Sequence, residues 1–187
     1  QNVNSSFDKV EIEQLSSDQK EDLRVEADAL LEKGNLEEAE SLYDEALEYY
    51  KQARRTYQRI GDLKGLVEAL QKIAVVFQGQ GHNNKALLKL EEALQIADEN
   101  GFNAMKAQIY SSFGAVYYLQ SDYQKALEIL QKALDINQNL NDRFLESQIL
   151  ERLGNIYQRL AEYEDSIKYY EKALSIARSV GNKRIEG

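Results

Sequence analysis

The sequence contains no cysteine, no proline and no tryptophan, and only one histidine and one methionine among 187 residues. Without cysteine there can be no disulfide framework, no thiolate metal site and no cysteine nucleophile. A chain of this length without proline, rich in alanine, leucine, glutamate, lysine and glutamine, is typical of a mostly helical protein. Its 43% of apolar residues suffices for one or two compact units or one extended array.

Long apolar runs and an excess of basic residues are also missing. No run approaches the roughly 20 residues of a membrane-spanning helix, and the N-terminal residues lack a signal-peptide pattern, so we expect no membrane insertion. Cytoplasmic localisation is the default expectation. The net charge of −9 disfavours nucleic acid as a partner, because phosphate binding needs clustered lysine and arginine. Because the only methionine is Met105, we expect a segment of a longer product, from which an upstream signal can be missing.

What the chain does contain is an internal repeat of 40 residues, visible in segments that begin at residues 70, 110 and 150. In each segment, apolar, small and aromatic residues recur at helical spacing, and a short polar turn precedes a second helix with its own small residues. Each unit is therefore predicted to be a helical hairpin. The residues in phase are Leu70, Tyr110 and Leu150; Ile73, Phe113 and Leu153; Ala74, Gly114 and Gly154; Phe77, Tyr117 and Tyr157; Ala86, Ala126 and Ser166; Leu90, Leu130 and Tyr170; Ala93, Ala133 and Ala173.

The boundaries between hairpins keep the same period. A residue suited to left-handed backbone is expected to end each second helix, and a following Asp or Asn is expected to cap the next helix. The predicted helix ends are Gly61, Gly101, Asn141 and Gly181, and the predicted caps are Asp62, Asp142 and Asn182.

The stretch ILERLGNIYQRL, residues 149–160, has Gly154 at the centre of a predicted helix, where glycine costs roughly 1 kcal/mol relative to alanine. We expect positions 74, 114 and 154 to face the small residue of the partner helix. Two helix backbones can then approach closely, and the packing gained offsets the lost propensity.

These residues resemble the tetratricopeptide repeat family in LGNIY at 153–157, FGAVY at 113–117, and the regularly spaced Ala93, Ala133 and Ala173. The resemblance covers about residues 18–182. The period is 40 instead of the family's usual 34, and the family's tryptophan and closing proline are absent. The longer repeat is similar to that of the subgroup found in kinesin light chains and bacterial multidomain proteins. The resemblance implies an all-α fold, a right-handed α-α superhelix of about four hairpins, at about 18–61, 62–101, 102–141 and 142–181.

The first hairpin is irregular, because its second-helix signature fits two registers. Ala39, Tyr43 and Ala46 fit a turn at Gly34-Asn35, whereas Ala46, Tyr50 and Ala53 fit the 40-residue phase. Seven residues rotate an apolar stripe by only about 20°. We therefore expect one long helix over about 36–60.

The two ends of the chain differ from the repeats. Residues 1–17 are expected to form a flexible extension; the alternative is that Phe7 and Val10 fold back onto the first hairpin or into the groove. Residues 183–187 align with the start of a further repeat helix, which predicts that the natural protein continues.

The resemblance places a binding groove on the first helix of each hairpin, with Asn155 at the position where the family often holds a ligand backbone. Glu151 stands where a carboxylate-binding lysine would be needed, so that type of clamp is not expected. Arg152 and Arg159 are expected to pair with Glu151 or Glu162, and Tyr118 and Leu119 can alternatively pack against the neighbouring unit. The predicted groove residues are Gln71, Val75, Gln78, Gln108, Ser111, Ala115, Tyr118, Leu119, Gln148, Glu151, Asn155, Gln158 and Arg159.

Catalysis has little support in the sequence. His82 lies in a polar turn without a second histidine or a cysteine, so we expect no metal site, no cofactor and no enzyme. We expect instead a protein-interaction scaffold that binds a peptide or partner protein in the concave groove. The alternatives are a regulatory or sensor segment of a larger bacterial protein, and an array that self-associates through its uncapped ends.

Overall fold

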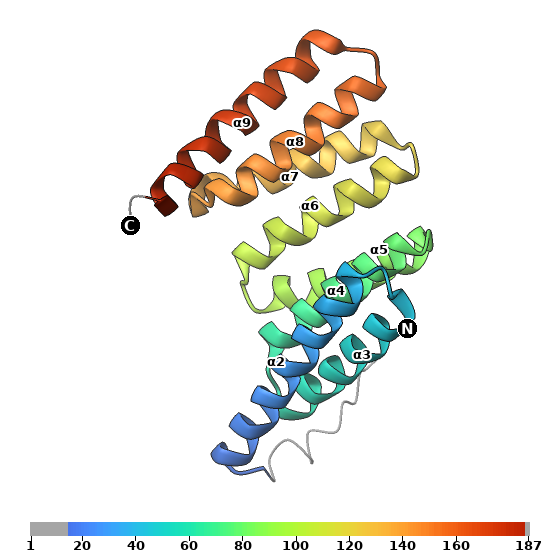
Figure 1. The fold of residues 1–187 in the computed structure, drawn as a ribbon, viewed down its shortest axis with the longest axis vertical. Coiled ribbons are helices and arrows are strands. Elements are labelled where there is room, and N and C mark those ends of the chain that lie inside the picture. Colours follow the sequence, from blue (N-terminus) through green and yellow to red (C-terminus); the bar gives the residue numbers. More distant parts are fainter. Residues whose placement is uncertain (1–14, 186–187) are drawn as a thin grey trace. The chain divides into compact units, whose positions relative to one another are not determined.

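The computed structural model describes residues 15–185, and this part of the chain consists of helices without a strand (Figure 1). The predicted all-α class is confirmed. The eight helices are α2 (Ser17–Ala39), α3 (Tyr43–Ile60), α4 (Leu63–Gly79), α5 (Asn83–Glu99), α6 (Asn103–Leu119), α7 (Tyr123–Leu140), α8 (Arg143–Arg159) and α9 (Tyr163–Ile185). Among these helices, none combines the length and apolar content that crossing a membrane requires.

The helices fall into two compact units, residues 1–82 and 83–187. In the first unit, α2 and α3 form a hairpin and α4 packs against α3. In the second unit, α6 with α7 and α8 with α9 form hairpins, α5 packs against α6, and α7 packs against α8. Helices α6 and α8, the first helices of two successive hairpins, also contact each other.

Three of the four predicted helix ends are confirmed. Gly61, Gly101 and Asn141 have left-handed backbone, with φ of 75°, 67° and 52°. The carboxylates of Asp62 and Asp142 accept hydrogen bonds from the backbone N–H groups of the next helices, as predicted for N-caps. The fourth prediction is wrong: α9 continues through Gly181 and Asn182 to Ile185, so residues 181–185 form no turn and no new helix start.

A second set of left-handed residues, which the sequence did not reveal, follows helices α2, α4, α6 and α8. Ser41, Gly81, Ser121 and Ala161 have φ between 61° and 76° and lie 40 residues apart. The backbone N–H after each of them donates to a carbonyl five residues earlier, as from Leu42 to Glu37. Only one of the four residues is glycine, so composition carried no signal.

The first hairpin differs from its prediction. Gly34 and Asn35 are helical residues inside α2, the chain turns at residues 40–42, and α3 begins at Tyr43. The predicted long helix over 36–60 is therefore wrong, and the 40-residue register holds. Tertiary packing decides this, because Gly34 is buried against Tyr50, the residue in phase with Leu130 and Tyr170.

The central glycines face large side chains instead of small ones. A Cβ atom on Gly154 would lie 2.8 Å from Cε1 of Tyr170, and one on Gly114 would lie 2.5 Å from Cδ2 of Leu130. The predicted small partner lies beside the glycine backbone: the Ser166 hydroxyl donates to the carbonyl of Gly154 at 2.9 Å. The glycine therefore makes room for a whole side chain at the centre of the hairpin.

The predictions for residues 1–14, including the contacts of Phe7 and Val10, lie outside the described residues. At the start of the described part, Ser16 caps α2, and Gln19 completes a capping box with it.

The packing at Gly154 predicts the effect of filling its space. Gly154→Leu should lower the free energy of unfolding by about 3 kcal/mol, because the new side chain would overlap the Tyr170 ring. Gln158→Leu, on an exposed position of the same helix, should change it by less than about 0.5 kcal/mol. Denaturant unfolding of both variants checks this, and equal effects would contradict the assigned packing.

The left-handed residues predict a stabilising change. Ala161→Gly should raise the free energy of unfolding by about 1 kcal/mol, because the Cβ atom of alanine disfavours a φ of 61°. The same change at Ala177, an exposed residue inside α9, should lower it by about 1 kcal/mol. Thermal unfolding measures both, and a loss of stability at both positions would refute the interpretation.

Candidate binding face on α6 and α8

The predicted groove residues lie on three helices. Gln71, Val75 and Gln78 belong to α4 in the first unit, where Val75 is exposed and the two glutamines are half-buried. The other ten residues belong to α6 and α8 in the second unit. We call the surface formed by these ten residues the α6/α8 face.

The α6/α8 face is mostly polar. Gln108 and Leu119 on α6 are exposed, and so are the predicted residues of α8 apart from Asn155, which is half-buried. Ser111 and Ala115 are buried, at 5% and 7% exposure, so they offer little contact area to a ligand. The exposed residues on α8 are Gln148, Glu151, Gln158 and Arg159.

A hydrogen bond between side chains ties the two helices together at one end of this face. Nε of Arg159 donates to the Tyr118 hydroxyl at 2.9 Å, and this bond raises the pKa of the guanidinium. The Tyr118 ring lies 5.9 Å from the ring of Tyr123. Tyr118 thus packs against its neighbours, in line with the alternative reading, whereas Leu119 remains 50% exposed.

Asn155 is tied to the helix behind it. Its Oδ1 accepts a hydrogen bond of 2.6 Å from the hydroxyl of Tyr170 on α9. The first hairpin repeats this arrangement, with Asn35 and Tyr50 at 3.0 Å. The Tyr50 hydroxyl also lies 2.7 Å from Glu38, and burial together with this carboxylate raises the pKa of Tyr50.

The pairing follows a rule within the chain. Where the second helix carries tyrosine at this position, the first helix carries Gly-Asn: Gly34-Asn35 with Tyr50, and Gly154-Asn155 with Tyr170. The glycine leaves room for the tyrosine ring, and the asparagine Oδ1 accepts a hydrogen bond from the tyrosine hydroxyl. The α6–α7 hairpin has Leu130 instead, and there the pair is Gly114-Ala115, which lacks a polar group.

Arg152 differs from Arg159, although both were expected to pair with local acids. Nε of Arg152 is buried and has no hydrogen-bond partner among the described residues. Burial lowers the pKa of this guanidinium, and the nearby charge of Glu151 partly offsets the effect. Removing this guanidinium from water therefore costs free energy, which the charge of Glu151 offsets only in part.

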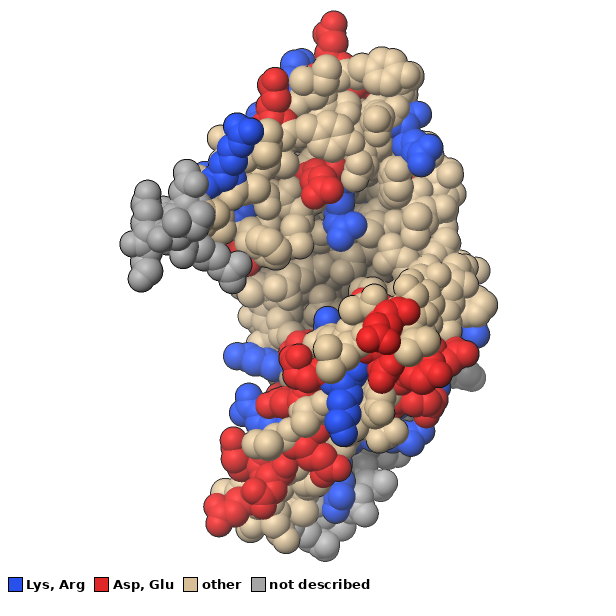
Figure 2. Space-filling model, in the orientation of Figure 1, with Lys and Arg blue, Asp and Glu red and all other residues tan. Residues whose placement is uncertain are grey.

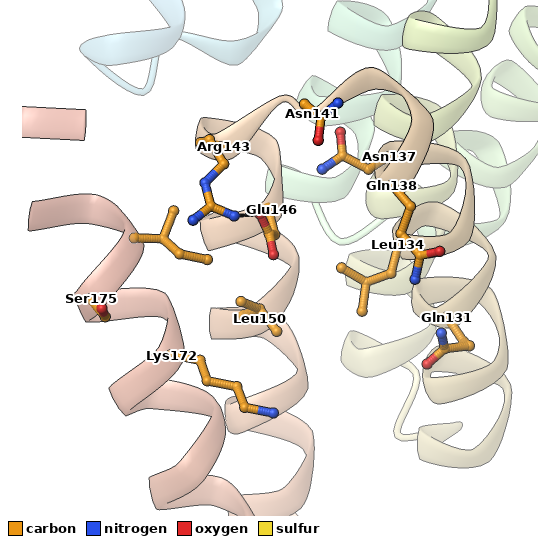
Figure 3. A pocket seen from close by; sticks show the side chains of 11 residues that line it. Gln131, Leu134, Asn137, Gln138, Asn141, Arg143, Glu146, Leu150, Lys172 and Ser175 are labelled. Carbon is orange, nitrogen blue, oxygen red and sulfur yellow. Dashed lines mark hydrogen bonds and ion pairs between the residues drawn. The ribbon is translucent and has the colours of Figure 1, made fainter. Parts of the chain in front are cut away.

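Away from this face, a cavity of about 590 Å³ opens between α7, α8 and α9 (Figure 3). Leu134 of α7, Leu150 of α8 and Ile176 of α9 supply its apolar lining. The Arg143–Glu146 ion pair, at 2.7 Å, and Lys172 lie at the same cavity.

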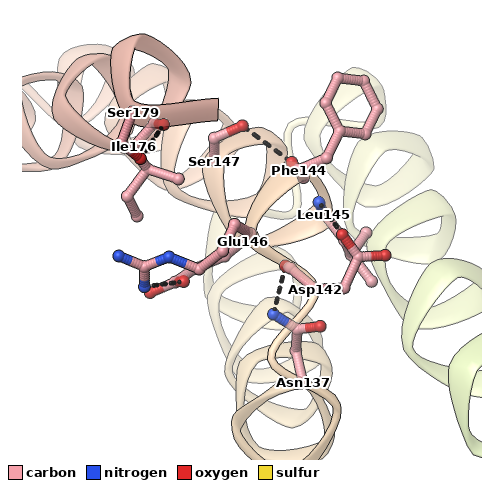
Figure 4. Close-up of polar contacts among 9 residues, drawn as sticks. Asn137, Asp142, Phe144, Leu145, Glu146, Ser147, Ile176 and Ser179 are labelled. Carbon is pink, nitrogen blue, oxygen red and sulfur yellow. Dashed lines mark hydrogen bonds and ion pairs between the residues drawn. The ribbon is translucent and has the colours of Figure 1, made fainter. Parts of the chain in front are cut away.

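Asn137 gives this cavity a buried polar group. Its Nδ2 donates to the backbone carbonyl of Asp142 at 2.9 Å, as Figure 4 shows, which fixes the orientation of the amide. Its Oδ1 is buried without a partner among the described residues.

The sequence analysis missed this cavity, yet the repeat explains it. At the positions of Leu150 and Glu146, the preceding repeat carries Tyr110 and Lys106. Lys106 forms an ion pair with Asp98, whereas the residues in phase with these two are Glu146 and the neutral Gln138. At these positions the contact between α7 and α8 therefore has a shorter apolar side chain, and it lacks the equivalent ion pair. Comparing the 40-residue segments for loss of volume could have found it.

His82 is exposed in the turn after α4, with its ring 6.5 Å from that of Phe77. Over residues 15–181, whose side chains are described, no three His, Cys, Asp or Glu residues gather in a way that could hold a metal ion.

The chain is similar to known proteins in sequence and in fold. A family model described as tetratricopeptide repeat matches residues 25–99 and 105–179, and a comparison with curated proteins finds no match. Among solved structures, the apo form of RapI has a TM-score of 0.73 and 18% identity, over 93% of this chain and 61% of RapI.

Two other solved structures are similar. Aspartyl phosphate phosphatase F from Bacillus subtilis has a TM-score of 0.76 and 15% identity, over 84% of this chain and 42% of its own. A Rap protein complexed with competence and sporulation factor has a TM-score of 0.75 and 22% identity, over 87% and 44%. At these identities the similarity shows the fold alone, and the chain spans 61% or less of these three proteins' lengths.

The Asn155–Tyr170 hydrogen bond predicts energetic coupling between these residues. A double-mutant cycle of Asn155→Ala and Tyr170→Phe should give a coupling of about 1 kcal/mol in the free energy of unfolding. Asn155→Ala combined with Tyr163→Phe, at an exposed tyrosine of the same helix, should be additive. Additivity in both cycles would exclude the bond in solution.

Proposed function

Because this chain belongs to the tetratricopeptide repeat family, we propose that it is a protein-interaction module that holds an extended peptide segment of a partner protein along the α6/α8 face. The family membership supports the general role of a scaffold. The choice of surface and of ligand is our proposal.

The observation that carries this proposal is the combination of exposed amides with one exposed apolar residue. Gln108, Gln148 and Gln158 each have a donor and an acceptor available at the surface. An extended peptide has free backbone N–H and C=O groups, which such amides can pair with. Leu119 can receive one apolar side chain of the peptide, in the manner of a binding hot spot.

The charges on the face favour an internal peptide segment over a free C-terminus. A terminal carboxylate needs clustered cations, but Glu151 contributes a negative charge, and Arg159 already donates to Tyr118. Asn155 can still use its amide N–H groups toward a ligand, since Tyr170 occupies only its oxygen. We therefore propose a neutral or basic segment as the ligand.

The comparisons support a binding role without identifying a ligand. One structural neighbour was crystallised with competence and sporulation factor, which is a property of that protein. We propose no catalytic activity for this chain.

A test begins with selection of binders from a phage-displayed library of random peptides, followed by calorimetry with a selected synthetic peptide. Leu119→Ala should weaken binding of that peptide by about fivefold or more, because it removes the apolar anchor. Gln158→Ala should weaken it to a lesser degree.

Leu88→Ala is the matched control, because Leu88 is also an exposed leucine but lies on α5, outside the α6/α8 face. It should leave the affinity unchanged. Failure to select any peptide, or an equal loss with Leu88→Ala and Leu119→Ala, would overturn the proposal.

A further inference from the structure

One face of α2 exposes apolar residues at positions that are buried or half-buried in the later repeats. Val25, Ala29 and Leu36 are exposed and lie along one side of the helix, four and seven residues apart. Leu36 is 68% exposed, although the residues in phase with it, Val76, Val116 and Ile156, are fully buried. We call the surface of Val25, Ala29 and Leu36 the α2 end face.

One face of α9 also exposes apolar residues whose counterparts in the preceding repeat are less exposed. Tyr163, Ile167 and Leu174 are 62%, 56% and 50% exposed. Their counterparts on α7 are Tyr123, Leu127 and Leu134, which are partly buried against the hydrophobic core. We call the surface of Tyr163, Ile167 and Leu174 the α9 end face.

The two end faces are the two halves of a contact that the second unit makes internally. There, α7 packs against α8, and Ile149 and Ile156 of α8 lie in one cluster with Leu127 and Leu134 of α7. The α2 end face corresponds to the α8 side of this contact, and the α9 end face corresponds to the α7 side. The α9 end face is therefore suited to pack against a helix like α2.

Helix α2 is strongly acidic: it carries eight acidic and three basic residues, a net charge of −5. Figure 2 shows acidic side chains gathered over α2. Over residues 163–181, α9 carries three acidic and three basic residues and is neutral. Like charges therefore disfavour contact between two α2 helices, whereas the neutral α9 does not repel α2.

We propose that the chain associates head to tail with a second copy of itself, with the α2 end face of one molecule seated on the α9 end face of the other. The contact is heterologous, so each molecule keeps one free end face after the first contact forms. This association uses neither the α6/α8 face nor the peptide proposed above.

Sedimentation velocity and light scattering of the 187-residue chain, from micromolar to millimolar concentration, test the proposal. The mean mass should rise with concentration. Ile167→Glu and Leu36→Glu should each abolish association. A chain that stays monomeric at millimolar concentration would refute the proposal.

Leu88→Glu is the matched control for these two variants. Leu88 is an exposed leucine on α5, and the three residues in phase with it, Glu48, Glu128 and Lys168, are charged, so its repeat position tolerates charge. This variant should associate like the unmodified chain. Equal loss of association in Leu88→Glu would show a non-specific effect and would overturn the assignment of the end faces.

A mixing experiment decides the polarity of the contact. Ile167→Glu keeps an intact α2 end face, and Leu36→Glu keeps an intact α9 end face. The two variants should therefore be monomeric alone and form a one-to-one dimer when mixed. If only one of the variants abolishes association, or the mixture stays monomeric, the contact is not head to tail and the proposal fails.

Discussion

The close approach of two helices within each hairpin is the contact on which the other features depend. In three hairpins a glycine on the first helix lies against a large side chain on the second: Gly34 against Tyr50, Gly114 against Leu130, and Gly154 against Tyr170. Removing the Cβ atom costs helix propensity, and the packing of a whole ring or isobutyl group in its place outweighs that cost.

This contact also shapes the surface that we propose for binding. A tyrosine that reaches across the hairpin needs a hydrogen-bond acceptor for its hydroxyl. In the first and last hairpins the residue after the glycine is an asparagine, whose oxygen accepts this hydrogen bond. Asn155 is thus held in position by the core side of its own hairpin. A side chain oriented in this way loses less entropy on binding than a free one.

The repeat also explains where apolar faces are exposed and where a cavity forms. Apolar positions that are buried or half-buried in other repeats are exposed on α2 and α9, where no neighbouring helix among the described residues covers them. Within the second unit, Leu150 and Glu146 replace Tyr110 and Lys106 of the preceding repeat, and a cavity of about 590 Å³ appears beside them. The same 40-residue comparison therefore identifies both the exposed end faces and the cavity.

Hydrophobic periodicity and turn residues by themselves determined the all-α class, the α6–α7 and α8–α9 hairpins, the left-handed ends at Gly61, Gly101 and Asn141, and the caps at Asp62 and Asp142. These features depend on interactions between residues a few positions apart, which a sequence displays directly. Other features depend on residues that meet only after folding. These features are the end of α2, the contacts of Gly154 and Arg159, the burial of Ser111 and the cavity. Gly34-Asn35 is a local turn signal, yet these residues are helical, because Gly34 packs against the buried ring of Tyr50. The free energy gained by burying this ring exceeds what an exposed turn at Gly34-Asn35 would contribute.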